Sequence, residues 1–447
     1  MDPRTWSYVL ENGITVTLIP RNDTKDLVYF SLVMRNGKID ETVDQLSYTH
    51  LFEHLFAQFT STKHPSSKEI KNRLSYIGAL TNAYTDIYTT GYWILGNNKH
   101  LKYYIDLFSS AYFDFQFDGN GNDAKEWNKH KNVVIEEIKM RNNDTWESVY
   151  ETIDKKMYGS RHRLGVDWKS ELNNVKIAEL EPLIRYNLSK FNPSCTTLFV
   201  EGNFNLLHTK KWLKLFFDKK GNQDHINTKY VLKIPKILKM SSFTQSTNNN
   251  VVVVRTQNST KNSIVVFTWT IWSSTINAFN QETSATLWVL NHYFCSGYLS
   301  RLFEVLREDK GLIYNLSSLY DLSPDPTIIP STFQIEIQVD PINVKKVIKM
   351  VQQEIEFLKK NEISLHDMTR IKNKIRFKKS IINTSKPPGK FTDTYAFNVV
   401  WKKPVPTFSN YFKILNQTTS KDICEMAKQV FQPKNLLIVV GDGRYKT

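Results

Sequence analysis

A short pattern occurs in both halves of the sequence and limits the folds that the chain can adopt. Phe191-Asn192-Pro193 leads into Leu198-Phe199-Val200, and Phe431-Gln432-Pro433 leads into Ile438-Val439-Val440. Each copy is typical of a proline-marked turn followed by a buried strand. Strand-rich sequence also restarts after the polar run 244–250. The repeat predicts two similar α+β domains, 1–220 and 251–447, joined by a linker over 221–250.

Composition places the chain among ordinary folded proteins. Of the 447 residues, 40% are hydrophobic and 23% are charged, which excludes a largely disordered chain. No apolar run approaches the roughly 18 residues of a membrane span, and the start lacks the pattern of a signal peptide. Three widely separated cysteines exclude a disulfide framework. We therefore expect no membrane span and a location in the cytoplasm or another reducing intracellular compartment.

The net charge of +15 raises the question of an anionic partner. A basic surface can bind nucleic acid, and that binding would weaken steeply with salt. The alternative is that the basic residues are spread over solvated faces. We favour this alternative because the sequence has no zinc-finger spacing, no RNA-recognition signature and no glycine-rich phosphate loop. A nucleic-acid partner is therefore not expected.

Local patterns predict the first elements of the N-terminal domain. Residues 8–18 alternate in polarity around Asn12-Gly13, which predicts a hairpin with a tight turn. Residues 80–95 are rich in threonine, tyrosine and tryptophan, which predicts one long or bent strand. Periodic apolar residues and capping patterns predict helices near 45–57, 66–77, 99–113 and 123–141.

The segment His50-Leu51-Phe52-Glu53-His54 carries the clearest indication of chemistry. On a helix, residues four apart lie on one face, so both imidazoles can reach one metal ion. Glu53 points towards the same space. Two histidines leave the site incomplete, because catalytic zinc usually has three protein ligands and a water molecule. The alternative is a chance pair of helical histidines without a metal.

Glu137 is the natural third ligand. It flanks the apolar stripe of Trp127, Val134 and Ile138 on its predicted helix, so its carboxylate can face inward. Glu136 is displaced by one residue and is expected to face solvent. The alternative for Glu137 is an ordinary surface glutamate, since helices rich in glutamate are common.

The order His-x-x-Glu-His inverts the common zinc-protease motif and resembles that of the pitrilysin (insulinase-like) metallopeptidases. The resemblance extends over nearly the whole chain, which is similar to the two-domain type of the mitochondrial processing peptidase catalytic subunit. Leu10-Glu11-Asn12-Gly13 resembles the family's opening hairpin, and Asn82-Ala83-Tyr84-Thr85 resembles its substrate-pairing strand. Residues 134–140 resemble the helix that carries its glutamate ligand, and Tyr158-Gly159 resembles the loop that follows. Residues 306–314 resemble its C-terminal substrate motif.

The resemblance implies a zinc-dependent endopeptidase that hydrolyses extended or unfolded peptides within an enclosed chamber. Zinc would be held by His50, His54 and Glu137, and Glu53 would be the general base. The second half of the sequence contains no His-x-x-Glu-His, so we expect one zinc ion per chain. The alternative is a non-catalytic subunit of the same fold that binds peptides or serves as a scaffold.

The resemblance also implies which residues contact the peptide substrate. Asn82, Ala83 and Thr85 would pair with its backbone, as in the addition of a strand to a sheet. Arg307 and Tyr314 would contact the peptide from the second half. Without the resemblance, these two residues would be taken for a helix-end arginine and a strand tyrosine.

The family's architecture implies two similar halves, each a mixed and mainly antiparallel sheet flanked by helices. Together they would form one bowl of a clamshell. Because one bowl leaves the chamber open, we expect a homodimer or a dimer with a related chain.

Two departures from the family pattern concern residues near the metal ligands. His130 occupies the position of a second glutamate that supports the site from outside the ligand shell. The segment 44–49 before the motif lacks the usual glycine. Neither change removes a ligand, so we expect an active site.

Overall fold

The computed structural model describes most of the chain. The described residues are 4–118, 123–142, 145–219, 251–254, 262–327, 329–384, 387–405 and 408–441. The linker expected over 221–250 lies outside them. The chain divides into two compact units. The first falls within Met1–Ile138, Trp168–Pro235 and Lys386–Val405, and the second within Lys139–Asp167, Lys236–Ser385 and Pro406–Thr447.

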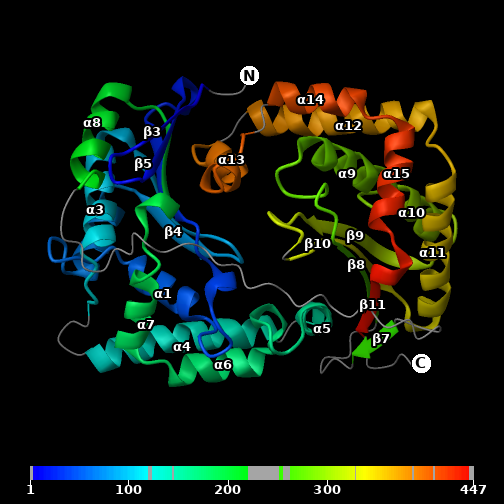
Figure 1. The fold of residues 1–447 in the computed structure, drawn as a ribbon, viewed down its shortest axis with the longest axis horizontal. Coiled ribbons are helices and arrows are strands. Elements are labelled where there is room, and N and C mark those ends of the chain that lie inside the picture. The colour runs from blue at the N-terminus through cyan, green and yellow to red at the C-terminus, as the bar shows by residue number, and fades with distance from the viewer. Residues whose placement is uncertain are drawn as a thin grey trace. The chain divides into compact units, whose positions relative to one another are not determined.

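The first unit is built around a six-stranded sheet (Figure 1). Its strands are β1 (Trp6–Val9), β2 (Thr15–Pro20), β3 (Leu27–Met34), β4 (Leu80–Thr85), β5 (Thr90–Asn97) and β6 (Thr196–Gly202). They lie in the order β1-β2-β6-β3-β5-β4. Strands β2 and β6 are parallel, and the other neighbours are antiparallel. Strand β4 therefore forms one edge of this sheet.

The second unit contains a five-stranded sheet of the same design. Its strands are β7 (Val251–Val254), β8 (Ser263–Ile271), β9 (Ile313–Asp321), β10 (Ser331–Val339) and β11 (Leu436–Gly441). They lie in the order β7-β11-β8-β10-β9, and only β7 and β11 are parallel. This order and these directions repeat β2-β6-β3-β5-β4 of the first sheet.

The repeated sequence pattern occupies the same place in both sheets. Pro193 begins the 3-10 turn η5 (Pro193–Cys195) before β6, and Pro433 begins η8 (Pro433–Asn435) before β11. Each turn leads into a fully buried strand that pairs with one parallel and one antiparallel neighbour. The prediction of two similar α/β halves with mainly antiparallel sheets is therefore confirmed.

Helices flank both sheets, and the four that the N-terminal sequence predicts are present as α1 to α4. The helices of the first unit are α1 (Tyr48–Phe56), α2 (Ser67–Tyr76), α3 (Leu101–Phe113), α4 (Asp123–Asn142), α6 (Trp168–Ile177), α7 (Leu180–Leu188), α8 (Leu206–Phe217) and α13 (Lys390–Val400), with the end of α4 beyond its boundary. Those of the second are α5 (Thr145–Tyr158), α9 (Gln281–Phe294), α10 (Arg301–Phe303), α11 (Val344–Lys360), α12 (Leu365–Thr384), α14 (Phe408–Gln417) and α15 (Ser420–Val430).

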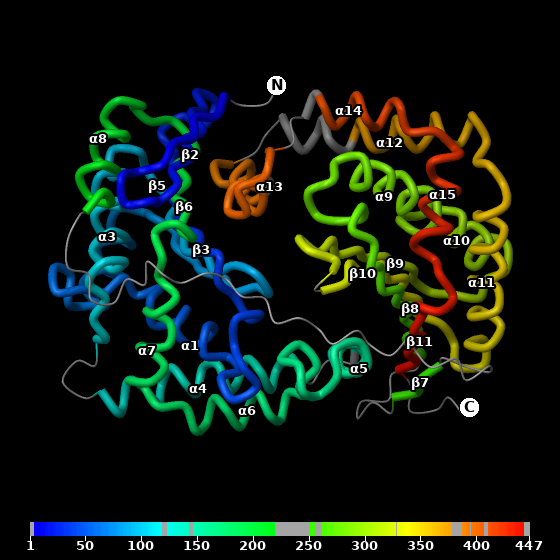
Figure 2. The backbone as a smooth tube through the Cα atoms, viewed as in Figure 1, coloured from blue at the N-terminus to red at the C-terminus, as the bar shows by residue number. Residues whose placement is uncertain are grey.

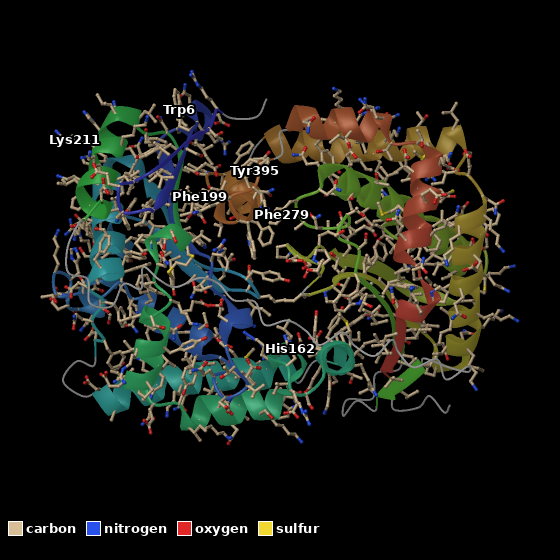
Figure 3. All side chains as sticks on the ribbon, viewed as in Figure 1. Trp6, His162, Phe199, Lys211, Phe279 and Tyr395 are labelled. Carbon is tan, nitrogen blue, oxygen red and sulfur yellow. The ribbon has the colours of Figure 1, made fainter. Side chains whose placement is uncertain are left out.

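Each sheet also packs against a helix from the other half of the sequence. Helix α13, orange in Figure 2, contacts β6 and β3, and its Ala396 and Val400 pack against Val33 and Phe199. Phe199, labelled in Figure 3, is fully buried there. In the second unit, α5 contacts β11, β8 and β7. Each sheet has two apolar faces to cover, and a helix from the other half of the sequence covers part of one face. The two units therefore differ from the continuous domains 1–220 and 251–447.

The hairpin at the N-terminus differs from its prediction in the turn. Strands β1 and β2 pair, but residues 10–14 separate them, and only Gly13 of the Asn-Gly pair has a positive φ, of 100°. The side-chain amide of Asn12 instead donates a hydrogen bond of 2.6 Å to the carbonyl oxygen of Phe217. The Asn-Gly pair thus fixes a wider loop to the end of α8 rather than closing a two-residue turn.

The single strand predicted over 80–95 was wrong, because the chain reverses and forms the antiparallel pair β4–β5. Asp86 causes the reversal. Its carboxylate accepts hydrogen bonds of 2.7 Å from the backbone N–H groups of Tyr88 and Thr89. A short polar side chain that bonds the backbone two and three residues later is a turn signal.

All three cysteines are free and buried. Within the described ranges, no helix has both the length and the apolar character that a membrane crossing requires.

Candidate metal centre

Helix α1 is held against the sheet by aromatic side chains. Phe56 lies 4.5 Å from Tyr92 of β5 between ring centroids, and Phe52 lies 5.2 Å from Phe115. Both phenylalanines are almost fully buried. Because they occupy the core side of α1, His50 and His54 lie at the edge of the core with about a fifth of each side chain exposed, 20% and 23%.

The N-terminus of α1 is fixed by Glu41. This buried carboxylate accepts hydrogen bonds from the backbone N–H groups of Ser47, at 3.1 Å, and Thr49, at 2.8 Å. Ser47 has a φ of 65°, in the left-handed region, and its hydroxyl donates a hydrogen bond of 2.5 Å to Glu171. A serine thus adopts a conformation that favours glycine, within the segment where the family's glycine is missing.

Helix α4 brings the third predicted ligand to the two histidines. Its apolar residues Trp127, Val134 and Ile138 are buried, and Glu137 lies beside this stripe. The Oε2 atom of Glu137 is 3.3 Å from the Nε2 atom of His50 and 3.6 Å from that of His54. The two Nε2 atoms are 3.3 Å apart.

These three distances fit a metal ion. With bonds of about 2.0–2.1 Å, a tetrahedral zinc site separates its donor atoms by roughly 3.3–3.4 Å. Two imidazoles and a carboxylate form a donor set of catalytic zinc, which leaves a fourth position open. In the described part of the chain, this is the only group of three such side chains whose ligand atoms converge. The geometry therefore allows His50, His54 and Glu137 to hold one metal ion.

Glu53 lies on α1 next to this group. Burial raises the pKa of the Glu53 carboxyl above its ordinary value, and the Glu137 carboxylate raises it further. Thr85, His54 and Lys38 act in the opposite direction. A carboxylate with a raised pKa beside a metal site is suited to accept a proton near neutral pH.

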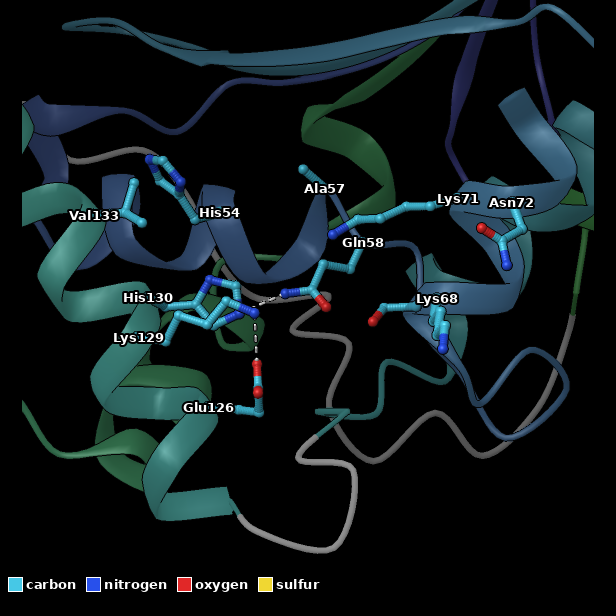
Figure 4. Close-up of a pocket in the computed structure, with 11 residues that line it drawn as sticks. His54, Ala57, Gln58, Lys68, Lys71, Asn72, Glu126, Lys129, His130 and Val133 are labelled. Carbon is cyan, nitrogen blue, oxygen red and sulfur yellow. Dashed lines mark hydrogen bonds and ion pairs between the residues drawn. The ribbon is translucent and has the colours of Figure 1, made fainter. Parts of the chain in front are cut away.

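His130 lies about two turns before Glu137 on α4. Its Nε2 atom is 2.6 Å from the Nε2 atom of Gln58 (Figure 4). Burial lowers the pKa of His130 to about 4, so its ring is neutral and can accept this hydrogen bond. The structure thus links His130 to Gln58. The sequence pattern did not indicate Gln58, because it lies in the turn that follows the end of α1 at Phe56.

The predicted substrate-pairing residues lie on the edge strand β4. Asn82 is exposed and Ala83 half-buried, and β4 pairs on one side with β5. The backbone N–H of Ala83 donates a hydrogen bond of 2.9 Å to the side-chain oxygen of Asn82. An edge strand is the element that an extended peptide can join. The roles of Asn82, Ala83 and Thr85 stay predictions.

Arg307 and Tyr314 belong to the second unit. Arg307 lies in the π-helical segment η6 (Glu304–Glu308), and Tyr314 lies at the start of β9. A guanidinium N–H of Arg307 donates a hydrogen bond to the carbonyl oxygen of Tyr314. The side chain of Tyr314 is exposed. This bond couples the two residues to each other, and their contact with a peptide stays a prediction.

The chain combines a mixed sheet that occurs twice with a His-x-x-Glu-His helix whose histidines lie close to a glutamate on another helix. These features define the class of metallopeptidases with the inverted motif. Two family models match the chain. The model described as insulinase (peptidase family M16) covers residues 16–164, and the model described as peptidase M16 inactive domain covers residues 180–375. The chain therefore belongs to the pitrilysin (insulinase-like) family.

Similarity to named proteins and to solved structures supports this assignment. The protein of Bacillus subtilis named zinc protease YmxG is 26% identical over 372 residues, which are 83% of this chain and 82% of that protein. A protein of Rickettsia felis named as a zinc protease is 24% identical over 442 residues, 97% and 96% of the two chains. The crystal structure of a protease from Helicobacter pylori matches with a TM-score of 0.81 at 19% identity, over 98% of this chain and 99% of that one. The similarity of the structures shows the shared fold.

Proposed function

We propose that this protein is a zinc-dependent endopeptidase. The observation that carries the proposal is the triangle of donor atoms from His50, His54 and Glu137, with sides of 3.3–3.6 Å. The choice of zinc is supported by the donor set and by relatives that are named zinc proteases. We expect about one zinc ion per chain, bound in the first unit.

Zinc would supply a Lewis acid that activates water and polarises the peptide carbonyl. The chain would supply the proton transfers. Glu53 accepts the proton of the attacking water, and then returns it to the nitrogen of the leaving amine. The raised pKa of Glu53 supports both steps, because it makes the carboxylate a better base and allows the carboxylic acid to keep the proton until the amine receives it.

The substrate in this proposal is an extended peptide. Asn82, Ala83 and Thr85 present an edge strand that can pair with a peptide backbone. Arg307 and Tyr314 would contact the same backbone, and a dimer with a second copy or a related chain would enclose it. Tyr314→Phe should then lower turnover without loss of zinc. Sedimentation of the active protein at its assay concentration tests the dimer, and a fully active monomer would contradict it.

The second candidate function is a non-catalytic subunit that binds peptides or serves as a scaffold. The family model described as an inactive domain covers residues 180–375. That range lies after the His-x-x-Glu-His segment, whereas the insulinase model covers this segment and Glu137. The side chains that catalysis requires are all present, and we therefore favour the enzyme.

Metal analysis combined with a peptide library tests the proposal. The purified protein should contain about one zinc ion per chain, and a chelator should abolish cleavage until zinc is added back. Glu137→Gln should weaken zinc binding, because it replaces a ligand carboxylate, while Glu136→Gln should not. A protein that binds zinc but cleaves no library peptide would favour the non-catalytic subunit.

A further inference from the structure

A pocket of about 680 Å³ opens beside the metal centre (Figure 4). Its walls come from the C-terminal end of α1, from α2 and from α4, all of which lie in the first unit. His54 contributes to this pocket and also to the cluster of candidate metal ligands. A group held in the pocket would therefore contact a residue of the candidate metal centre.

The lining of this pocket is positively charged. It contains Lys68, Lys71 and Lys129 but only one carboxylate, that of Glu126. Glu126 is 3.2 Å from Lys129 and offsets its charge. Lys68 and Lys71 form no ion pair with any residue that the structure describes. Two ammonium groups thus remain available to an anion.

The positions of these two lysines are set by α2. They are three residues apart, so they lie on the same side of that helix. Lys68 lies in the first turn of α2, where the helix dipole adds positive potential, and Lys71 lies in the second turn. The uncharged side of the pocket is formed by Gln58, which is bonded to His130, and by Ala57 and Val133. This arrangement offers apolar contacts to the stem of a side chain and positive charge to its end.

We propose that this pocket binds an acidic side chain of the peptide substrate, from a residue adjacent to the scissile bond. The inference rests on the proposed peptidase function, because it places the peptide at the metal. A peptide residue spans about 3.3 Å along an extended backbone, so only side chains close to the scissile bond can enter a pocket that shares His54. A lysine or arginine side chain would be repelled by Lys68 and Lys71.

Peptides that differ at one position test the proposal. A set carries Glu, Gln or Lys at each position flanking the cleavage site, and kcat/KM is measured for every member. The wild type should prefer Glu to Lys at one of these positions by about tenfold or more, because a hydrogen bond to a charged group contributes roughly that factor. The double variant Lys68→Glu, Lys71→Glu should reverse this preference.

The control is Lys211→Glu, which makes the same kind of charge change on exposed α8, outside the pocket. It should keep the preference of the wild type. Lys71→Gln provides a milder variant that removes charge without reversing it, and it should reduce the preference for Glu. Equal cleavage of the Glu and Lys peptides by the wild type would overturn the proposal.

A binding measurement separates this proposal from the proposed function. The dissociation constants of the Glu and Lys peptides are measured on the zinc-loaded Glu53→Gln protein, where no cleavage is needed. Tighter binding of the Glu peptide, abolished in the Lys68→Glu, Lys71→Glu background, supports the pocket even if the wild type hydrolyses nothing. Cleavage of both peptides with equal dissociation constants refutes the pocket and leaves the peptidase intact. Absence of both binding and cleavage refutes both.

Discussion

Thr392 donates two hydrogen bonds to the buried carboxylate of Glu201, from its backbone N–H at 2.9 Å and from its hydroxyl at 3.0 Å. The same carboxylate accepts a hydrogen bond of 3.0 Å from Arg21. Thr392 lies on α13 and Glu201 on β6. A residue from the C-terminal half of the sequence thereby joins the sheet that supports the candidate metal centre.

Thr392→Val should destabilise the protein by about 1–2 kcal/mol, because the valine keeps the shape of threonine and removes one bond to a buried carboxylate. Chemical denaturation of both proteins measures the difference. Thr62→Val is the control, since the hydroxyl of Thr62 is exposed and outside this network. Equal stability of the Thr392 variant and the wild type would show that the hydroxyl contributes nothing to holding α13 against the sheet.

Ser47 allows a comparison of backbone strain and hydrogen bonding at the start of α1. Ser47→Ala loses the bond to Glu171 and keeps the positive φ. Ser47→Gly loses the same bond but removes the strain, which amounts to roughly 1 kcal/mol. We expect the glycine variant to be more stable than the alanine variant by about that amount in thermal unfolding. The opposite order would mean that the left-handed conformation costs little here.

The neutral state of His130 predicts a pH dependence of stability. Its pKa is lowered from 6.5 to about 4 in the folded chain, and that of His162 is lowered to the same value, in both cases mainly by burial. Between about pH 4 and about pH 6.5, the unfolded chain therefore binds more protons than the folded chain. The free energy of unfolding should then fall as the pH decreases from about 6.5 to about 4. Denaturation curves of the metal-free protein measure this slope, and His130→Gln should make it shallower. An unchanged slope would contradict a neutral His130.

The edge strand β4 predicts a kinetic effect without loss of metal. Ala83→Pro removes an N–H group that bonds the Asn82 side chain, and a proline is tolerated on an edge strand. We expect zinc content and melting temperature to stay near those of the wild type, while kcat/KM falls. Unaltered kinetics in this folded variant would place the peptide elsewhere.

The repeat and the closeness of His50 to His54 could be predicted from the sequence because both depend on short-range patterns. The Pro-marked strands at Pro193 and Pro433 have the same local chemistry, and His50 and His54 are one helical turn apart. The exchange of α5 and α13 between the halves could not be predicted, because their apolar faces match any exposed sheet equally well. The reversal at Asp86 was missed because the strand propensity of its neighbours outweighed a single turn residue. The link from His130 to Gln58 depends on how two helices pack.

The zinc content and peptide hydrolysis of Glu53→Gln, measured beside the wild type, test the central claim most directly. Glutamine has nearly the shape of glutamate but cannot accept the proton, and Glu53 is not among the three converging ligands. We predict about one zinc ion per chain in both proteins, hydrolysis by the wild type, and a loss of hydrolysis in the variant by at least a hundredfold. Full hydrolysis by a zinc-loaded Glu53→Gln protein would contradict this account.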